Sequence, residues 1–371
     1  MKRRLLLVVG TRPEVIKLAP VARVLARRGR RPVLAGTGQH RALLDQMLET
    51  FGLELDHDLD LMRRGQTPGD VLSAALPKLK EVFAAERPSI VVVQGDTTTA
   101  LAAALAAFNM GIPVAHVEAG VRSRDLSQPY PEEANRVIID RVARLHFAAT
   151  RENRKNLLRE GIPSRGIRVT GNTVVDSLRW MLKRQHAWGD KKLERFLAAR
   201  EGRPKALLTI HRRESFGAPL KRVLGAVKLL VEKVPGLCVV FPAHLNPAVL
   251  GPARALKHPD ILVSRPLSYP DFVRTAGRCD VILSDSGGVQ EEAPTLGVPV
   301  VVLRAVSDRP EAVKAGLAVL AGTSPALIVR GTMSVLRDAS AFRRSLRAHR
   351  DLFGDGKAAE RIAEVLSSGA L

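Results

Sequence analysis

Aromatic side chains and cysteines are scarce in this chain of 371 residues. Phe, Trp and Tyr make up only 4% of it, and the two cysteines are Cys238 and Cys279. Proteins that bind single-stranded nucleic acid rely on aromatic stacking, so the low aromatic content argues against a base-stacking platform. The cysteines lie in separate apolar runs without the C-x-x-C spacing of redox or metal sites. We therefore expect two buried thiols in a reducing compartment.

A long hydrophobic run is also missing, since no apolar segment approaches the roughly 20 residues that a transmembrane helix needs. The N-terminus, MKRR followed by the apolar residues Leu5–Val9, is similar to the start of a signal peptide. Residues 10–14, GTRPE, end that apolar stretch too early for one. The sequence therefore predicts that Leu5–Val9 is a buried strand and that the protein is cytoplasmic, with no membrane partner.

Acidic residues are few relative to basic ones. The chain has 37 Asp and Glu against 58 Lys and Arg, which gives a formal net charge of +21. Such a charge is compatible with nucleic-acid binding, but the basic residues are dispersed rather than clustered. We interpret the charge as a basic surface that helps to attract an anionic small substrate, and we expect no nucleic-acid partner.

Short apolar segments alternate with segments of helical periodicity along the whole chain. Strands that are apolar on both faces and separated by helices are typical of parallel sheets, so the sequence predicts an α/β protein with two doubly wound, Rossmann-like domains. We place the domains at 1–171 and 172–371. The sequence does not decide on which of the two domains the last helix, Ala358–Leu366, packs. The predicted strands are 5–9, 32–35, 90–94, 113–117, 145–148, 167–170, 206–210, 237–241, 261–263, 281–283 and 299–303.

Ligands of open α/β sheets bind beyond the carboxyl ends of the strands, and two such domains predict a site in the cleft between them. Glu118 ends a strand without an evident capping role, whereas Asp96 either caps the next helix or acts in the cleft. Adjacent helical residues point about 100° apart, so at most one of Glu132 and Glu133 faces a given site. The polar candidates of the first half are Arg12 and Lys17 after the first strand, Asp96 and Glu118 at later strand ends, and Glu132 at the start of a helix.

The most informative segment of the second half is 284–304, SDSGGVQEEAPTLGVPVVVLR. Its two glycines leave amide groups uncovered at a helix N-terminus, which favours a phosphate. Glu292 lies one turn beyond Gly288 on the same face, where its carboxylate accepts hydrogen bonds from ribose hydroxyls. His211 lies beside two arginines at another strand end, which suits a diphosphate, and Arg309 follows a later strand. An ordinary βα turn is the alternative interpretation of the glycine pair.

Motifs for metals and redox cofactors are weak. The sequence has no H-E-x-x-H pair, no Cys/His cluster and no phosphate-binding P-loop, and Gly36-Thr37-Gly38 lacks the third glycine of a dinucleotide fingerprint. Asp58-Leu59-Asp60 matches the D-x-D by which some glycosyltransferases bind a divalent ion, but we interpret it as solvated loop charge. We therefore expect no metal and no cofactor.

Taken together, these motifs resemble those of the non-hydrolysing UDP-N-acetylglucosamine 2-epimerases, which have the two-domain GT-B fold. The resemblance implies a cofactor-independent isomerase that interconverts UDP-GlcNAc and UDP-ManNAc, usually as a homodimer, and supplies sugars for cell-surface polysaccharide. The matching segments follow the family's order through nearly the whole chain: GTRPEVIKLAP (10–20), GQHRALLDQML (38–48), QGDTTT (94–99), HVEAGVRS (116–123), YPEEANRVIID (130–140), TGNTVVDSL (170–178), TIHRRESFG (209–217), SDSGGVQEEAPTLGVPVVVLR (284–304) and DRPEAV (308–313).

The resemblance also implies roles for single residues. UDP leaves C1 as the C2 proton is removed, and re-addition to the bound 2-acetamidoglucal with protonation on the other face inverts C2. The resemblance assigns acid, base or electrostatic roles to Asp96, Glu118, Glu132 and His211. The substrate-binding positions are Arg12, Lys17, Phe272, Ser286, Gly287, Gly288, Glu292 and Arg309.

The chain departs from the family pattern in two places. Ser307-Asp308 stands where the family commonly has Thr-Glu. Ala42 and Gly65 stand where some bacterial members use Gln and Arg to bind a second UDP-GlcNAc as an activator, which argues against that activation, although Gln39, His40 and Gln66 remain.

Other functions are also compatible with the sequence. They are a hydrolysing 2-epimerase that releases ManNAc and UDP, an epimerase of a related UDP-diacetamido-uronic acid, and a glycosyltransferase of the same fold. A glycosyltransferase is disfavoured by the several carboxylates expected in the cleft. Outside the enzymes, a nucleic-acid-binding protein is supported only by the net charge of +21.

Overall fold

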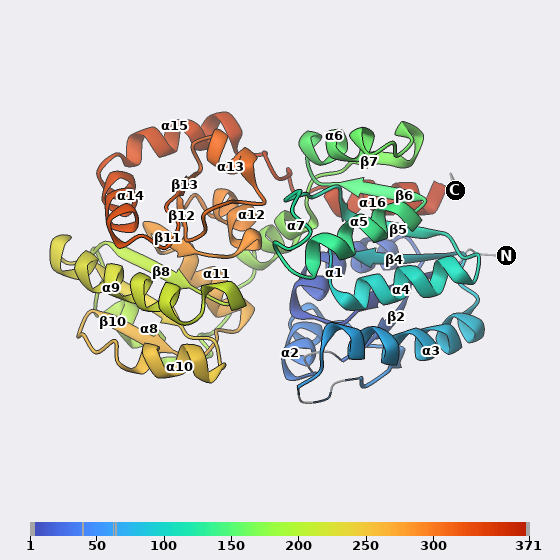
Figure 1. The fold of residues 1–371 in the computed structure, drawn as a ribbon, viewed down its shortest axis with the longest axis horizontal. Helices are drawn as coiled ribbons and strands as arrows, with labels where there is room; N and C mark the ends of the chain where they lie inside the picture. The colour runs from blue at the N-terminus through green and yellow to red at the C-terminus, as the bar shows by residue number, and fades with distance from the viewer. Residues whose placement is uncertain (1–3, 39–40, 62, 64, 369–371) are drawn as a thin grey trace. The chain divides into compact units, whose positions relative to one another are not determined.

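The computed structural model describes residues 4–38, 41–61, 63 and 65–368 (Figure 1). Gln39 and His40, named above for the activator pattern, lie outside the described residues. The chain forms two compact units, here called unit 1 (Met1–Ser177 with Phe353–Leu371) and unit 2 (Leu178–Leu352). The last helix, α16 (Ala358–Ser368), belongs to unit 1, where it packs against α1 (Arg12–Arg27).

Within the described residues, unit 1 is built on a parallel sheet of seven strands in the order β3-β2-β1-β4-β5-β6-β7. The strands are β1 (Leu5–Val9), β2 (Val33–Gly36), β3 (His57–Asp58), β4 (Ile90–Gln94), β5 (Val114–Ala119), β6 (Leu145–Ala148) and β7 (Ile167–Val169). Besides α1 and α16, the helices are α2 (Arg41–Phe51), α3 (Pro68–Glu86), α4 (Thr98–Asn109), α5 (Glu132–Val142), α6 (Arg151–Arg159) and α7 (Thr173–Leu182), which ends in unit 2.

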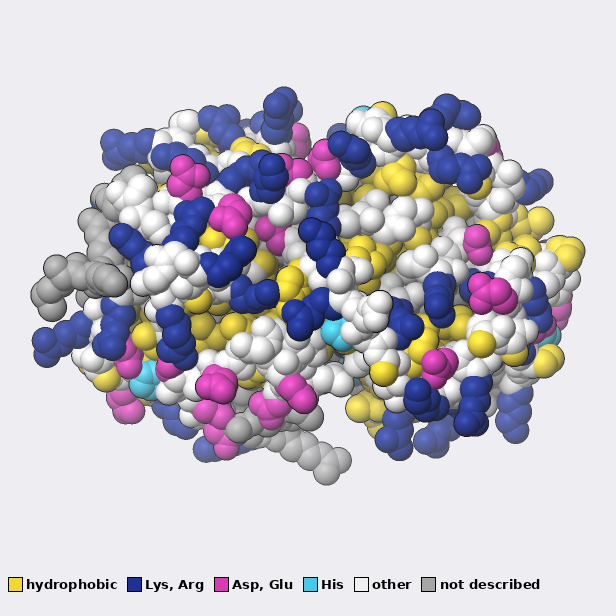
Figure 2. All heavy atoms as spheres, turned by 180° about the vertical axis from the view of Figure 1, so that it is seen from behind, with side chains coloured by type: hydrophobic (Ala, Val, Ile, Leu, Met, Phe, Trp, Pro, Cys, Tyr) yellow, Lys and Arg dark blue, Asp and Glu magenta, His cyan; other side chains and the backbone are white. Residues whose placement is uncertain are grey.

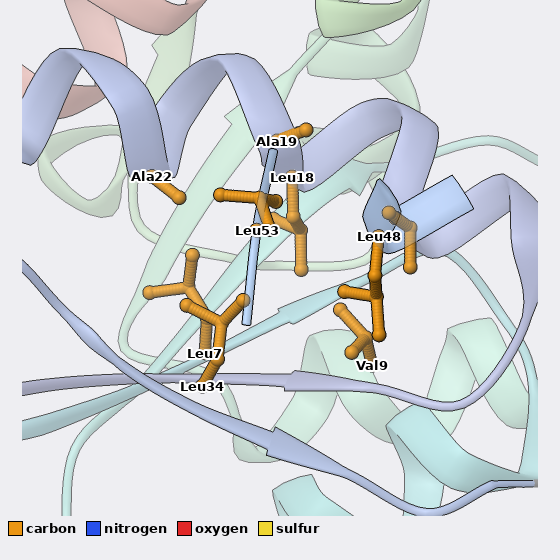
Figure 3. Close-up of a pocket in the computed structure, with 9 residues that line it drawn as sticks. Leu7, Val9, Leu18, Ala19, Ala22, Leu34, Leu48 and Leu53 are labelled. Carbon is orange, nitrogen blue, oxygen red and sulfur yellow. The ribbon is translucent and has the colours of Figure 1, made fainter. Parts of the chain in front are cut away.

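Strand β1 shows why an apolar run becomes a central strand. Successive side chains of a strand point to opposite faces, so a run that is apolar throughout is buried on both. Leu6 and Val8 belong to the core formed with α3 and α4. Leu7 and Val9 line an apolar space with residues of α1 and α2 (Figure 3). That space admits no water molecule and is part of the core rather than a ligand site.

Unit 2 repeats this design with six parallel strands, within the described residues, in the order β10-β9-β8-β11-β12-β13. The strands are β8 (Lys205–Thr209), β9 (Cys238–Pro242), β10 (Ile261–Ser264), β11 (Val281–Ser284), β12 (Val300–Val302) and β13 (Ala318–Leu320). The helices are α8 (Lys191–Ala198), α9 (Ala218–Lys233), α10 (Pro247–Arg254), α11 (Tyr269–Ala276), α12 (Gly287–Leu296), α13 (Pro310–Lys314), α14 (Pro325–Arg337) and α15 (Ala339–His349). One face of the sheet forms a core with α9, α10 and α14.

The prediction of two doubly wound, parallel α/β domains is confirmed. In both units the strand order reverses next to the first strand, between β1 and β4 in unit 1 and between β8 and β11 in unit 2. Such switch points place the carboxyl ends of adjacent strands where a ligand can enter between the loops. The candidate residues described below follow these four strands and their neighbours.

Two short edge strands, β3 and β13, were not predicted from the sequence. Both lie at sheet edges and are exposed on one or both faces, so they produce no buried apolar run. The interpretation of Asp58 as loop charge is therefore wrong in one respect, because Asp58 ends β3. Its side chain is exposed, as expected, and accepts a hydrogen bond from the amide of Asp60 at 3.2 Å.

The surface agrees with the composition. Lys and Arg side chains are scattered across the visible face rather than gathered over one element (Figure 2). Both cysteines are buried, as predicted. Among the residues that the structure describes, no helix is long and apolar enough to cross a membrane.

Asp176 binds the first backbone amides of α16. Because its carboxylate is buried, it makes the free energy of unfolding depend on pH. Its carboxylate accepts hydrogen bonds from the amides of Ala358 at 3.2 Å and Ala359 at 2.9 Å. Burial raises the pKa of Asp176 to about 6, although these hydrogen bonds oppose the shift. The folded protein therefore binds more protons than the unfolded chain between about pH 4 and pH 6, and this group's contribution to stability falls as pH rises through that window.

We expect the free energy of unfolding of the wild type, relative to Asp176→Asn, to fall by up to about 3 kcal/mol between pH 4 and pH 7. Urea denaturation of both proteins at several pH values measures this difference. Asp355→Asn is the control, because hydrogen bonds from Arg361 lower the pKa of Asp355 to about 2. We expect the free energy of unfolding of the wild type, relative to Asp355→Asn, to fall as pH decreases below 4, which is the opposite pH dependence. A difference between wild type and Asp176→Asn that stays constant with pH would contradict the assignment.

Candidate active site

Glu118 and Lys17 form a buried ion pair in unit 1. The Lys17 ammonium donates to Oε2 of Glu118, and the two side chains are only 10% and 8% exposed. Gln94, the last residue of β4, donates to the same oxygen at 2.6 Å. Residues from α1, β4 and β5 therefore meet at the carboxyl end of the sheet, as the strand-end argument predicts.

Glu118 is held in a backbone conformation that is rare for residues other than glycine. Its φ is +70°, and the register between β5 and β6 shifts between Val117 and Ala119. Glu118 is thus an extra residue inside β5, a bulge that re-aims one side chain. Left-handed backbone costs about 1–2 kcal/mol for such a residue and persists only where surrounding contacts fix it. The predicted strand, 113–117, ends two residues before the observed end of β5 at Ala119.

Asp96 does not cap the following helix, so that alternative is wrong. Thr97 caps α4 instead, and its side chain accepts a hydrogen bond from the amide of Ala100 at 3.0 Å. The Asp96 carboxylate forms an ion pair with Arg136 on α5. Its backbone carbonyl accepts a hydrogen bond from the Asn135 side chain at 2.8 Å. Helix α5 therefore holds Asp96 in position.

The adjacent acids Glu132 and Glu133 point in different directions, as helix geometry requires. Glu133 is buried and accepts hydrogen bonds from the amides of Ser123 at 3.0 Å and Arg124 at 2.9 Å. It is a structural residue that fixes the loop after β5. Glu132 begins α5 and is only partly buried, and it stays the candidate acid of this pair.

A further buried carboxylate, Glu14, was not predicted. It accepts hydrogen bonds from the amides of Gly10 at 2.9 Å and Thr11 at 2.7 Å, and from the Thr97 hydroxyl at 2.7 Å. Burial raises the pKa of Glu14, although these hydrogen bonds oppose the shift. Glu14 ties the end of β1 to the end of β4, beside the candidate Arg12. The T-x-x-E capping box at Thr11 and Glu14 was the signal that could have found it.

In unit 2, Asp285 holds the loop that contains His211 by accepting hydrogen bonds from its backbone amides. It is fully buried, and it accepts hydrogen bonds from the amides of His211 at 3.2 Å and Arg212 at 3.0 Å. Nδ1 of His211 lies 3.1 Å from its carboxylate. Burial alone would raise the pKa of Asp285, but the hydrogen bonds and charge of His211 lower it overall. Asp285 thus orients His211, whose side chain is 49% exposed and accessible to a ligand.

The N-terminus of α12 lies after β11, as the glycine-pair argument predicts. Ser286 is its N-cap residue, with a long contact of 3.4 Å from the Val289 amide to its hydroxyl. A Cβ atom at Gly287 would lie 3.1 Å from the Asp308 carboxylate, whereas one at Gly288 would make only an ordinary contact of 3.8 Å with the Ser286 hydroxyl. Asp308 therefore explains the first glycine.

Glu292, Arg309 and Phe272 lie on or beside α11 and α12. Glu292 is buried and accepts a hydrogen bond from the Tyr269 hydroxyl at 3.1 Å, which joins the two helices. Arg309 is buried too, and its Nε lies 2.6 Å from Oε1 of Glu291. Phe272 on α11 is partly buried. Glu291 was not predicted; both adjacent acids are buried, and the sequence does not show that Glu291 pairs with Arg309.

The remaining candidates have simpler surroundings. Gly65 is exposed, and Gln66 accepts a hydrogen bond from the Arg63 amide and donates to the carbonyl of Leu61, both at 2.8 Å. Ala42 lies on α2. Among the described residues, no group of three or more His, Cys, Asp or Glu side chains is arranged to hold a metal ion.

Comparison with known proteins gives consistent matches. A family model described as UDP-N-acetylglucosamine 2-epimerase matches residues 23–367. The chain is 43% identical to the UDP-N-acetylglucosamine 2-epimerase of Yersinia pestis over 371 residues, 98% of each chain. The structure of the Neisseria meningitidis UDP-GlcNAc 2-epimerase bound to UDP-GlcNAc matches with a TM-score of 0.90 and 37% identity, covering 99% of this chain and 100% of that one. The Methanocaldococcus jannaschii UDP-GlcNAc 2-epimerase in complex with UDP-GlcNAc and UDP matches with a TM-score of 0.85 and 33% identity, covering 99% and 100%.

Proposed function

Because this chain belongs to the UDP-N-acetylglucosamine 2-epimerase family, we propose that it interconverts UDP-GlcNAc and UDP-ManNAc without releasing the sugar. The observation that carries the proposal is a match over nearly the whole chain to epimerases, two of them solved with UDP-GlcNAc bound. The family resemblance noted from the motifs is confirmed by the same match. By that resemblance we also propose a cytoplasmic homodimer that supplies ManNAc-type sugars for cell-surface polysaccharide.

The chemistry of the substrate favours elimination over simple deprotonation. The hydrogen on C2 is not next to a carbonyl, so its removal alone would leave an unstabilised carbanion. We propose that a base takes the C2 proton while the C1–O bonding electrons leave with UDP, which forms a C1–C2 double bond in 2-acetamidoglucal. Re-addition of UDP to C1, with a proton delivered to the other face of C2, then gives the epimer.

Each unit is proposed to supply one part of this reaction. In unit 2, the amides at the start of α12 and the exposed ring of His211 suit the departing diphosphate, which gains negative charge. Glu292 suits the ribose. In unit 1, Asp96, Glu118 and Glu132 are the proposed proton-transfer groups, by the resemblance of their motifs to the family's, and Asp96 and Glu118 also lie at strand ends. Lys17 beside Glu118 stabilises its negative charge.

Incubation with UDP-GlcNAc in heavy water is expected to give UDP-ManNAc, with deuterium at C2 of both epimers, because the proton is exchanged with solvent-derived hydrogen at the intermediate. Proton NMR follows both products in one sample. Free ManNAc with UDP would identify a hydrolysing enzyme instead. Unchanged substrate without exchange would overturn the proposal, and a parallel sample with the UDP-diacetamido-uronic acid tests the alternative sugar.

A further inference from the structure

A buried histidine that the proposed reaction does not use lies two residues before Glu118 on β5. The side chain of His116 is 0% exposed. Its Nδ1 lies 2.6 Å from Oδ1 of Asp140 on α5, and its Nε2 lies 2.7 Å from the carbonyl oxygen of Gly95. Both ring nitrogens therefore face oxygen atoms, in the interior of unit 1.

The hydrogen-bond partners of the two ring nitrogens of His116 indicate which nitrogens carry hydrogen. A carbonyl oxygen can only accept, so Nε2 must donate to Gly95. Asp140 also receives hydrogen bonds from the Gly120 amide at 3.1 Å and from Arg122 at 2.7 Å. Burial alone would raise the pKa of Asp140, but the charges and hydrogen bonds of His116 and Arg122 lower it to about 2. Arg122 and the Gly120 amide both donate to this carboxylate, so it is ionised without counting His116, and Nδ1 of His116 donates to it as well.

The charges around His116 balance. Arg122 binds both oxygens of Glu160, the residue after α6, at 2.7 Å each. With a proton on both ring nitrogens, His116 would join Arg122 in facing two anions, Asp140 and Glu160, so that the buried charges balance. On β6, His146 pairs in register with His116 and lies 2.8 Å from the carbonyl of Asp140. Burial lowers the pKa of His146, so this second histidine adds no charge.

The hydrogen bonds of this cluster end on backbone next to the two strand-end acids. Gly95 precedes Asp96, and Gly120 follows Glu118 by two residues. We propose that His116 is a buried imidazolium and a positioning residue, which holds Gly95 directly and Gly120 through Asp140. The role of the two acids rests on the proposed epimerisation, but the charge on His116 does not.

Two protons on the ring are needed for this role. A neutral imidazole donates a single hydrogen bond, so either Gly95 or Asp140 would lose its donor. The turn that carries Asp96, or the bulge that carries Glu118, would then be less firmly held. Displacement of a reacting group by about 1 Å lowers rate about 10²-fold, although the substrate still binds.

Nitrogen NMR of the protein labelled with ¹⁵N-histidine tests the charge directly. We expect both ring nitrogens of His116 to carry hydrogen up to pH 8, where exposed histidines have lost one proton. Its signals are assigned by their absence in His116→Gln or by their proximity to the Gly95 and Gly120 amides. An unprotonated Nδ1 or Nε2 at pH 8 overturns the inference, whatever the enzyme's activity.

Kinetics test the positioning role. We expect His116→Gln to lower kcat about 10²-fold while KM and the affinity for UDP change little, because the acids move but the nucleotide site does not. His146→Gln is the matched control, a buried histidine paired in register with His116 but without contact to the two turns, and it should keep its kcat. If His116→Gln does not fold, Asp140→Asn removes the counter-charge instead.

The outcomes separate this inference from the proposed function. A wild type that shows no C2 exchange refutes the epimerisation, while the NMR signals still report the charge on His116. A wild type that exchanges, together with His116→Gln at the wild-type rate, refutes the positioning role alone. Equal losses of kcat in His116→Gln and His146→Gln also refute it, because they indicate a general loss of packing.

Discussion

Replacing Glu118 with glutamine is expected to lower kcat for C2 epimerisation by about 10²- to 10⁴-fold, the usual contribution of a positioned acid or base. Glutamine keeps the volume and an oxygen that can accept from Lys17 and Gln94, but it cannot take up a proton. The Kd for UDP should stay near the wild-type value, because the groups proposed to hold the diphosphate and the ribose, namely His211, the first amides of α12 and Glu292, lie in unit 2. Initial rates of UDP-ManNAc formation measure the effect, and calorimetric titration measures UDP binding.

The control for this variant is Glu81→Gln, which makes the same chemical change at an exposed position on α3. It should leave kcat unchanged. Circular dichroism and the melting temperature of both variants show whether the fold is kept, since Lys17 loses its counter-charge in Glu118→Gln. A folded Glu118→Gln enzyme with near-normal kcat would remove Glu118 from the proposed machinery. Asp96→Asn is expected to behave like Glu118→Gln, with the same measurements.

Replacing Gly120 with alanine is expected to lower the free energy of unfolding by about 2–4 kcal/mol, from left-handed backbone and overpacking together. Gly120 has φ +83°, and a Cβ atom there would lie 2.3 Å from the carbonyl oxygen of Asn153 and 2.8 Å from Leu157. Backbone cannot move aside as a flexible side chain can. Urea denaturation at neutral pH measures the loss.

Gly161→Ala is the matched control for Gly120→Ala. Gly161 has a similar φ of +80°, but nothing lies within 4 Å of its missing Cβ atom. The loss there should be about 1 kcal/mol, the conformational penalty alone. Equal losses at the two positions would show that the contact with Asn153 is relieved without penalty.

Much of the fold could be predicted because buried parallel strands are apolar on both faces. The strands Leu5–Val9, Ile90–Gln94 and Leu145–Ala148 have the predicted bounds. Edge strands lack that signal, so β3 and β13 were missed. The bulge at Glu118 could not be predicted either, since it depends on how β5 pairs with β6 rather than on residue type.

Prediction of the site was limited in a different way. A sequence shows which acids follow strands. It does not show which of two adjacent residues becomes the N-cap of the next helix, and in α4 the N-cap is Thr97 rather than Asp96. It also does not show which acids turn toward backbone amides. Glu14 and Asp285 do so, and Asp285 orients the candidate His211, although neither acid was a candidate itself. The catalytic and binding roles of the named residues remain predictions.

The return of the chain to unit 1 affects the order in which the units can fold. Unit 2 is one continuous segment, Leu178–Leu352, whereas unit 1 needs residues from both sides of it. Helix α16 covers α1, its first amides are bound by Asp176, and Arg361 donates to the carbonyl of Thr170 at 2.9 Å. During synthesis, unit 2 can therefore close as soon as it leaves the ribosome. Unit 1, although made first, cannot complete the contact between α1 and α16 until the residues beyond 352 have been made.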